Sequence, residues 1–115
     1  MDIEEFRNYC LSKPLVNESL PFDEKTLVFK VGGKMFALTN LDSFESINLK
    51  CDPERAVELR EKYNDVRPGY HMNKTHWNTV SVNQQLTDGF IISLIDHSYD
   101  LVYKSLPKSI KSPQK

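Results

Sequence analysis

Eleven consecutive residues in the second half of the chain combine side chains that could bind a ligand. Behind a Pro-Gly pair, residues 68–78 contain two histidines, one lysine, two asparagines and one tryptophan. Asn73 and Lys74 can donate hydrogen bonds to a phosphate or to a base edge. His76 and Trp77 can hydrogen-bond to nucleotides or stack on them. One interpretation of this pattern is a segment that contacts nucleic acid.

A purely structural role explains the same residue types. Tyr70 and Trp77 could anchor the segment to the core through their rings. Asn73 could cap a turn, and the histidines could complete local hydrogen bonds. On residue types alone, the structural interpretation is favoured over the functional one.

The other reactive side chains form no recognisable catalytic or metal-binding pattern. His71 and His76 are five positions apart and His97 is distant, which matches the common metal-ligand spacings poorly. Cys10 and Cys51 form no CxxC pair, so free buried thiols are expected in a chain without an export signal. We therefore expect no enzyme activity, no cofactor and no bound metal.

Composition predicts one cytoplasmic domain without a strong overall charge. The 115 residues are 39% hydrophobic and include one Trp, five Tyr and six Phe, which is enough for a hydrophobic core. No apolar run could span a bilayer, and the acidic N-terminus lacks the features of a signal peptide. The net charge is −1, whereas dedicated DNA-binding proteins are usually basic. Local basic groups remain, namely Lys25, Lys30 and Lys34, and Lys104, Lys108, Lys111 and Lys115.

Three helices are marked by residues that favour helix starts. Asp2 with Glu5 resembles a capping box and opens a short amphipathic helix that ends before Pro14. Asp52 before Pro53 opens a second helix, because Asp caps free amides and Pro fits the first helical position. Thr87 caps the last helix. Its buried face is expected to contain Ile91, Leu94, Ile95, Ser98, Leu101 and Val102.

Strands occupy the middle of the chain. They are expected at residues 27–31, 34–38, 44–50, 66–70 and 77–82. The Gly32-Gly33 pair suits the positive φ angles of a tight hairpin between the first two. Since the strands do not alternate regularly with helices, we predict an α+β fold, an antiparallel sheet with helices packed on one face. Residues 1–106 would form a single domain, and residues 107–115 a polar C-terminal tail.

Several stretches of the sequence resemble the MmcQ/YjbR family of bacterial proteins. They are residues 28–38, 48–54, 68–74, 76–80, 98–102 and 106–108. The resemblance spans nearly the whole chain in the expected order. It implies a CyaY-like fold, similar to a double-wing DNA-binding domain, and a DNA-binding function. Thr75 stands where many members carry a second basic residue, which removes one phosphate contact.

The resemblance and the basic residues together predict a DNA-binding protein that acts as a transcription-related or regulatory module. Double-stranded DNA would be the partner, the chain would be a monomer, and no membrane would be involved. The predicted contacts are Lys34, Arg67, Asn73, Lys74, His76 and Trp77. The alternative is a protein-interaction or small-ligand-binding module without nucleic-acid binding, which the near-neutral charge favours.

Overall fold

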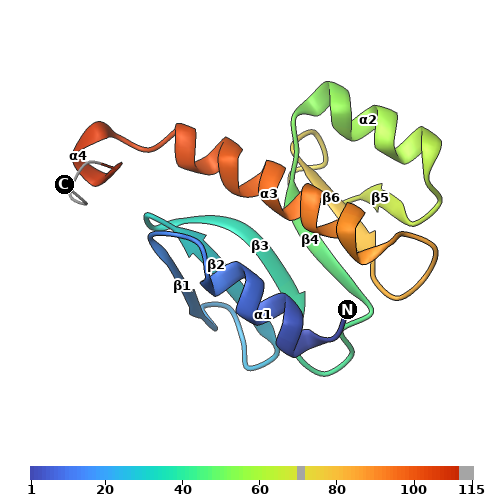
Figure 1. Ribbon diagram of the computed structural model, residues 1–115, viewed down its shortest axis with the longest axis horizontal. Coiled ribbons are helices and arrows are strands. Elements are labelled where there is room, and N and C mark those ends of the chain that lie inside the picture. The colour runs from blue at the N-terminus through green and yellow to red at the C-terminus, as the bar shows by residue number, and fades with distance from the viewer. Residues whose placement is uncertain (70–71, 112–115) are drawn as a thin grey trace.

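The computed structural model describes residues 1–69 and 72–111, and it shows an α+β fold built on one antiparallel sheet. The sheet has six strands in the order β1-β2-β3-β4-β6-β5. The strands are β1 (Val16–Ser19), β2 (Thr26–Val31), β3 (Lys34–Asn40), β4 (Ser46–Lys50), β5 (Val66–Pro68) and β6 (Trp77–Ser81). The helices are α1 (Ile3–Leu11), α2 (Pro53–Lys62), α3 (Asp88–Lys104) and α4 (Lys108–Lys111). Figure 1 shows how these elements are arranged, and the predicted fold class is confirmed.

The three predicted helix starts are all present. At α1, the backbone N–H of Glu5 donates to Asp2 Oδ1 at 2.8 Å, and the N–H of Asp2 donates to Glu5 Oε1 at 2.9 Å. Asp52 and Thr87 cap α2 and α3 in the same way, accepting from the amides of the third helical residues. Each cap satisfies an amide that the helix itself leaves without a partner.

Helices α1, α2 and α3 pack on one face of the sheet, as predicted, and bury a continuous hydrophobic core. Its largest fully buried side chains include Phe6, Phe29, Phe36, Ile47, Ile91 and Ile95. Tyr99 of α3 is also buried, with 6% of its surface exposed, whereas Leu101, which was expected to be buried, is only half-buried. We call this side of the molecule the helix side.

A β-bulge in the β2–β3 hairpin decides which residues reach the opposite side of the sheet. Phe29 pairs with Ala37 but Lys30 pairs with Met35, so Phe36 is one extra residue in β3. Phe36 and Ala37 therefore both belong to the core on the helix side, while Met35 packs in a second cluster on the other face. An extra residue of this kind interrupts the regular alternation of a strand.

Two stretches differ from the predicted strands. Val16–Ser19 forms the edge strand β1, which is not among the strands expected from the sequence. Its four residues show too little hydrophobic alternation to be recognised. Phe44 was placed in a strand, but it has a φ of 40° and precedes β4. Its ring packs on Phe6 with centroids 5.6 Å apart, so Phe44 contributes to the core from a turn.

The part of the predicted polar tail that the structure describes contains a short helix. After Pro107, α4 forms one helical turn, and Ile110 packs against the core. Gly32, at the hairpin turn with a φ of 57°, lies directly beneath this segment. A Cβ at Gly32 would lie 2.6 Å from Leu106 Cδ1. The glycine thus serves both the turn and the close approach of the C-terminal segment. No helix in the described parts of the chain is long and apolar enough to cross a bilayer.

A hydrogen-bonded carboxylate joins α1 to α3. Tyr9 Oη donates to Asp96 Oδ1 at 2.5 Å, and Lys13 Nζ lies 2.7 Å from the same oxygen. Burial acts to raise the pKa of Asp96, but the hydrogen bonds from Lys13 and Tyr9 outweigh it and hold this pKa below its ordinary value. Since the folded-state pKa is depressed, the carboxylate stabilises the fold above its unfolded pKa, and this contribution is lost as the pH falls through the folded-state value.

We therefore expect Asp96→Asn to lower the free energy of unfolding at pH 7 by about 1 kcal/mol, the upper range for a partly exposed ion pair. The difference from the wild type should shrink as both proteins are acidified below about pH 4, the ordinary Asp value. Urea unfolding at pH 7 and at pH 3 measures this difference in the free energy of unfolding. Asp100→Asn, an exposed carboxylate on the same helix, is the matched control and should show neither effect. An Asp96→Asn difference that stayed constant with pH would contradict this account.

Candidate nucleic-acid interface

The face of the sheet opposite the helix side, the helix-free face, is defined by the strand register. Residues directly opposite each other on neighbouring strands share a face, so the pairing can be followed from strand to strand. This face contains Asn17, Ser19, Thr26, Val28, Lys30, Met35, Leu38, Asn40, Ser46, Asn48, Lys50, Arg67, Trp77, Thr79 and Ser81. One hydrogen bond confirms the shared face, because Thr79 Oγ1 donates to Asn48 Oδ1 at 2.7 Å.

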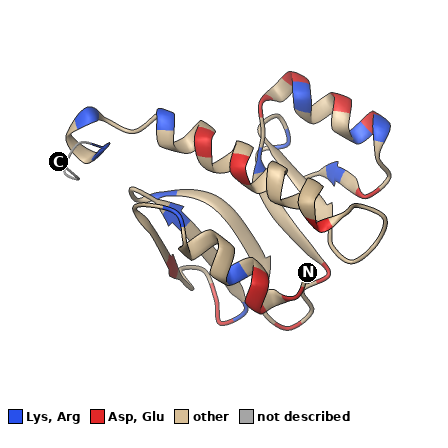
Figure 2. Ribbon diagram, viewed as in Figure 1, with Lys and Arg blue, Asp and Glu red and all other residues tan. Residues whose placement is uncertain are grey.

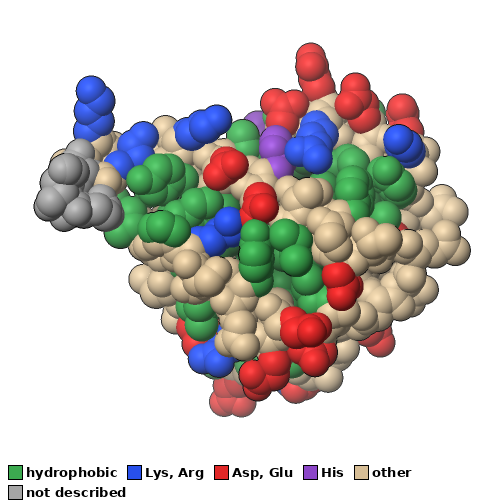
Figure 3. All heavy atoms as spheres, viewed as in Figure 1, with side chains coloured by type: hydrophobic (Ala, Val, Ile, Leu, Met, Phe, Trp, Pro, Cys, Tyr) green, Lys and Arg blue, Asp and Glu red, His purple; other side chains and the backbone are tan. Residues whose placement is uncertain are grey.

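The helix-free face is basic, although the chain as a whole is slightly acidic. Of the residues that define it, Lys30, Lys50 and Arg67 are cationic and none is a carboxylate. The acids are concentrated elsewhere, and Figure 2 shows them along α1, α2 and α3. Figure 3 shows the helix side, where red carboxylate side chains lie over α1 and α2, with blue lysine and arginine side chains between those of α2. The near-zero net charge of the chain therefore results from two sides with different distributions of charged side chains.

An apolar centre lies between these cations. Val28, Leu38 and Trp77 form a small buried cluster, and Met35 and Met72 pack against it. Only 7% of the surface of Trp77 is exposed. The indole therefore anchors the start of β6 to the sheet, the structural role that the sequence also suggested.

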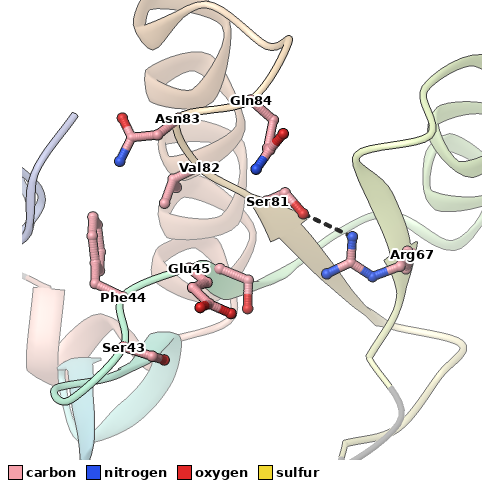
Figure 4. Close-up of a pocket in the computed structure, with 9 residues that line it drawn as sticks. Ser43, Phe44, Glu45, Arg67, Ser81, Val82, Asn83 and Gln84 are labelled. Atoms are coloured by element: carbon pink, nitrogen blue, oxygen red, sulfur yellow. Dashed lines mark hydrogen bonds between the residues drawn. The ribbon is translucent and has the colours of Figure 1, made fainter.

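Arg67 lies near the edge of the sheet beside a polar pocket of about 570 Å³. Its Nη1 donates to Ser81 Oγ at 2.8 Å, and Figure 4 shows the guanidinium pointing from β5 toward Ser81 on β6. The pocket is also lined by Ser43, Glu45, Ser46, Asn83 and Gln84. Arg67 is exposed, so its remaining N–H groups can reach a phosphate outside the pocket.

The segment after β5 turns back on itself and continues the sheet. The N–H of Gly69 donates to the carbonyl of Trp77 at 2.9 Å, and a Cβ at Gly69 would lie 2.9 Å from Trp77 Cβ. Asn73 makes a local turn, since its Oδ1 accepts from the N–H of Thr75 at 2.8 Å and its carbonyl accepts from the N–H of Trp77 at 2.9 Å. Tyr70 and His71, which the sequence suggested as an anchor and as a local hydrogen-bonding residue, lie outside the described residues.

Arg60 of α2 holds this segment from the helix side. Its Nε donates to Asn78 Oδ1 at 2.6 Å, and its Nη2 donates to the carbonyls of Lys74 and Trp77. Asn78 is 2% exposed. Arg60 is not among the site residues predicted from the sequence. The signal for its role was weak, namely an Asn among the apolar positions of a predicted strand.

The six predicted contacts do not form one patch. Arg67 and Trp77 share the helix-free face, whereas Asn73 and Lys74 lie in the turn after β5. Lys34 begins β3 at the hairpin, paired with Val31 of the core. It is three strand spacings from β5, about 14 Å. His76 is half-buried, and its carbonyl accepts from the N–H of Cys51 at 2.7 Å.

The structure adds two cations that the sequence had not placed in the site. Lys30 and Lys50 come from the middle of the sheet and share a face with Arg67 and Trp77. Neighbouring residues of a strand point to opposite faces of the sheet. Because Val31 and Leu49 point into the core, Lys30 and Lys50 next to them point to the helix-free face. The sequence could not decide which face of the sheet stays uncovered by helices.

The remaining reactive groups lie in structural positions. Burial raises the pKa of the Cys10 thiol to about 12 and also raises that of Cys51. Both cysteines are free and buried, as predicted. His97 Nε2 accepts the N–H of Asp52 at 3.1 Å, next to the start of α2. Within residues 1–69 and 72–111, no group of three or more His, Cys, Asp or Glu side chains is placed to hold a metal ion.

Comparison with known proteins relates the chain to one family. The YjbR family matches residues 11–101. The chain is 38% identical to the uncharacterized protein YjbR of Escherichia coli K12 over 109 residues, covering 94% of this chain and 92% of that protein. It is 37% identical to the uncharacterized protein YbdF of Escherichia coli O157:H7 over 106 residues, covering 91% and 87%.

Two solved structures have a similar fold. A Deinococcus radiodurans protein with a DUF419 domain superposes with a TM-score of 0.89 at 38% identity, covering 95% of this chain and 84% of that one. A Pseudomonas syringae protein superposes with a TM-score of 0.75 at 31% identity, covering 89% and 99%.

Proposed function

The chain belongs to the YjbR family, and from the character of its helix-free face we propose that it binds DNA through this face. The observation that carries the proposal is the placement of Lys30, Lys50 and Arg67 on one sheet face whose strand residues include no carboxylate. The carboxylates Asp23 and Glu45 lie in loops that adjoin this face. Phosphate contacts from Lys and Arg supply most of the sequence-independent affinity for DNA. The proposed activity is binding without catalysis, in a transcription-related or regulatory role.

The arrangement of the cations suits a nucleic-acid backbone. Lys30, Lys50 and Arg67 lie on β2, β4 and β5, so that two strand spacings, about 10 Å, separate each from the next across the sheet. Lys74 lies in the turn after β5, with its carbonyl bound by Arg60, and we propose it as a fourth phosphate contact beyond the sheet. The proposal therefore involves three or four phosphate contacts and a modest affinity.

Titration of a labelled DNA duplex, followed by fluorescence anisotropy at several salt concentrations, tests the proposal. With three phosphates neutralised, the logarithm of the binding constant should fall with the logarithm of the salt concentration with a slope of about −3. Lys50→Ala and Lys74→Ala should each weaken binding and reduce the magnitude of the slope by about 1. Lys104→Ala removes the same charge from the end of α3 and should leave both quantities unchanged.

Two results would count against this function. One is the absence of duplex binding at low salt up to high micromolar protein. The other is an equal effect of Lys104→Ala and Lys50→Ala, which would show that the helix-free face has no special role.

A second candidate function is the binding of a small ligand, and one observation favours it. The helix-free face is hollowed at its apolar centre, next to Leu38 and Met72, and apolar hollows with a few polar groups are typical of ligand sites. A small-ligand module would leave the duplex unbound in the titration described above.

A further inference from the structure

A hollow of about 460 Å³ opens on the helix-free face. Its apolar lining comes from three elements: Phe22 precedes β2, Leu38 lies on β3, and Met72 lies in the turn after β5. Leu38 is 4% exposed and belongs to the apolar centre of the face. Phe22 is 64% exposed, so this aromatic ring has most of its surface available for contact with a ligand.

Two carboxamides line the same hollow and are held in fixed orientations. Asn48 Oδ1 accepts from Thr79 Oγ1 at 2.7 Å. Asn40 Oδ1 accepts from the N–H groups of Asp42 and Ser43 at 2.8 and 3.2 Å. In both side chains the oxygen accepts from the protein, and the Nδ2 group can donate to a ligand. The ring nitrogens and exocyclic carbonyl oxygens of a nucleobase are acceptors for such a donor.

Both signs of charge lie around the hollow: the Asp23 carboxylate accepts from Thr26 Oγ1 at 3.2 Å, and two cations lie on the same sheet face as Asn48. Lys50 lies two residues beyond Asn48 on the same face of β4, about 7 Å along the strand. Arg67 lies in the cross-strand row that contains Asn48, through the pairing of Asn48 with Thr79 and of Thr79 with Arg67. A ligand here would place an aromatic, acceptor-bearing part in the hollow and an anionic part on these cations.

We propose that this hollow binds one unpaired base of a nucleic-acid strand, with the adjoining phosphates on Lys50 and Arg67. The inference rests on the proposed DNA-binding function and adds to it a preference for an unstacked base. In a duplex the bases are stacked and unavailable to the hollow, so duplex DNA would use the phosphate contacts alone. Stacking of a base on an aromatic side chain corresponds to about a 5- to 150-fold gain in affinity.

The test compares a short labelled oligothymidylate, an abasic strand of the same length, and a duplex. The oligothymidylate should bind the wild type at least about 5-fold more tightly than the abasic strand does. Phe22→Ala should remove this preference while leaving the affinity for the abasic strand unchanged. Val57→Ala, which truncates an exposed apolar side chain of α2 on the helix side, is the matched control and should retain the preference.

The outcomes separate the base site from the function on which it rests. Equal affinities for the oligothymidylate and the abasic strand would overturn the base site, while the salt-dependent duplex binding would still stand. An equal loss of preference in Phe22→Ala and Val57→Ala would also overturn it. The absence of binding to all three ligands would overturn both proposals.

Discussion

Replacing Ser98 with alanine is expected to lower the free energy of unfolding by about 3 kcal/mol. Ser98 lies in α3 and is completely buried. Its Oγ donates to the carbonyl of Phe36 at 2.5 Å and accepts from the N–H of Lys50 at 2.9 Å. One hydroxyl thus satisfies a backbone acceptor of β3 and a backbone donor of β4.

The bulge explains why this position matters. Phe36 is the extra residue of β3, and an extra residue locally disrupts the ladder. Alanine would remove the hydroxyl partner of the buried Phe36 carbonyl and of the part-buried Lys50 N–H. A buried group left unsatisfied costs about 1–3 kcal/mol. The Phe36 carbonyl and the Lys50 N–H lie at the contact between α3 and the strands β3 and β4, which contribute to the candidate site.

Urea denaturation of Ser98→Ala and the wild type measures the effect as a shift of the midpoint at unchanged slope. Ser93→Ala is the matched control: Ser93 is exposed on the same helix, and its Oγ donates only to the carbonyl of Phe90, one turn away. It should cost less than about 0.5 kcal/mol, as surface substitutions usually do. A Ser98→Ala cost no larger than that of Ser93→Ala would show that the bulge is held by other contacts.

The second large effect is expected at Arg60. Replacing it with methionine keeps most of the aliphatic length but removes all donors to Asn78, Lys74 and Trp77. We expect a loss of about 3 kcal/mol, because hydrogen bonds to charged groups contribute about 1.5–3 kcal/mol each and Asn78 is buried. The turn after β5 should also loosen, since the carbonyls of Lys74 and Trp77 both accept from this side chain.

Urea denaturation measures the stability, and amide hydrogen exchange of residues 72–77 measures the local opening. Arg60→Lys retains the charge but not the fork of donors, so it should recover only part of the loss. Arg55→Met, at a half-buried position of α2 whose side chain has no such donor set to the segment, is the control and should leave exchange of the turn unchanged. Faster exchange in both variants alike would indicate general loosening of α2 instead.

Local signals in the sequence were sufficient for most of the elements. Asp2, Asp52 and Thr87 mark helix starts because capping depends on residues three positions apart. Gly32 and Gly33 mark the hairpin because a tight turn needs positive φ angles, which glycine adopts easily and which both residues have. These features need only neighbouring residues, and for that reason they can be recognised in a single sequence.

The candidate site depended on pairing between distant parts of the chain. Lys30 and Lys50 are separated by twenty positions, and only the register of β2, β3 and β4 places them on one face. The bulge at Phe36 changes the face to which successive side chains of β3 point, and no local residue pattern indicates this bulge. Arg60 reaches its partners across α2 and β6, a contact that follows from helix packing and not from spacing.

The separation of charge between the two sides gives the molecule an electric dipole in place of a strong net charge. A protein of net charge −1 is hardly drawn toward a polyanion from a distance, but the field of that polyanion exerts a torque that turns the sheet toward it. Association would then proceed at the ordinary rate of about 10⁵–10⁷ M⁻¹s⁻¹ for unsteered encounters. The phosphate contacts that salt weakens would form only after the sheet has turned toward the polyanion. Ionic strength would therefore change mainly the lifetime of the complex and affect the association rate little.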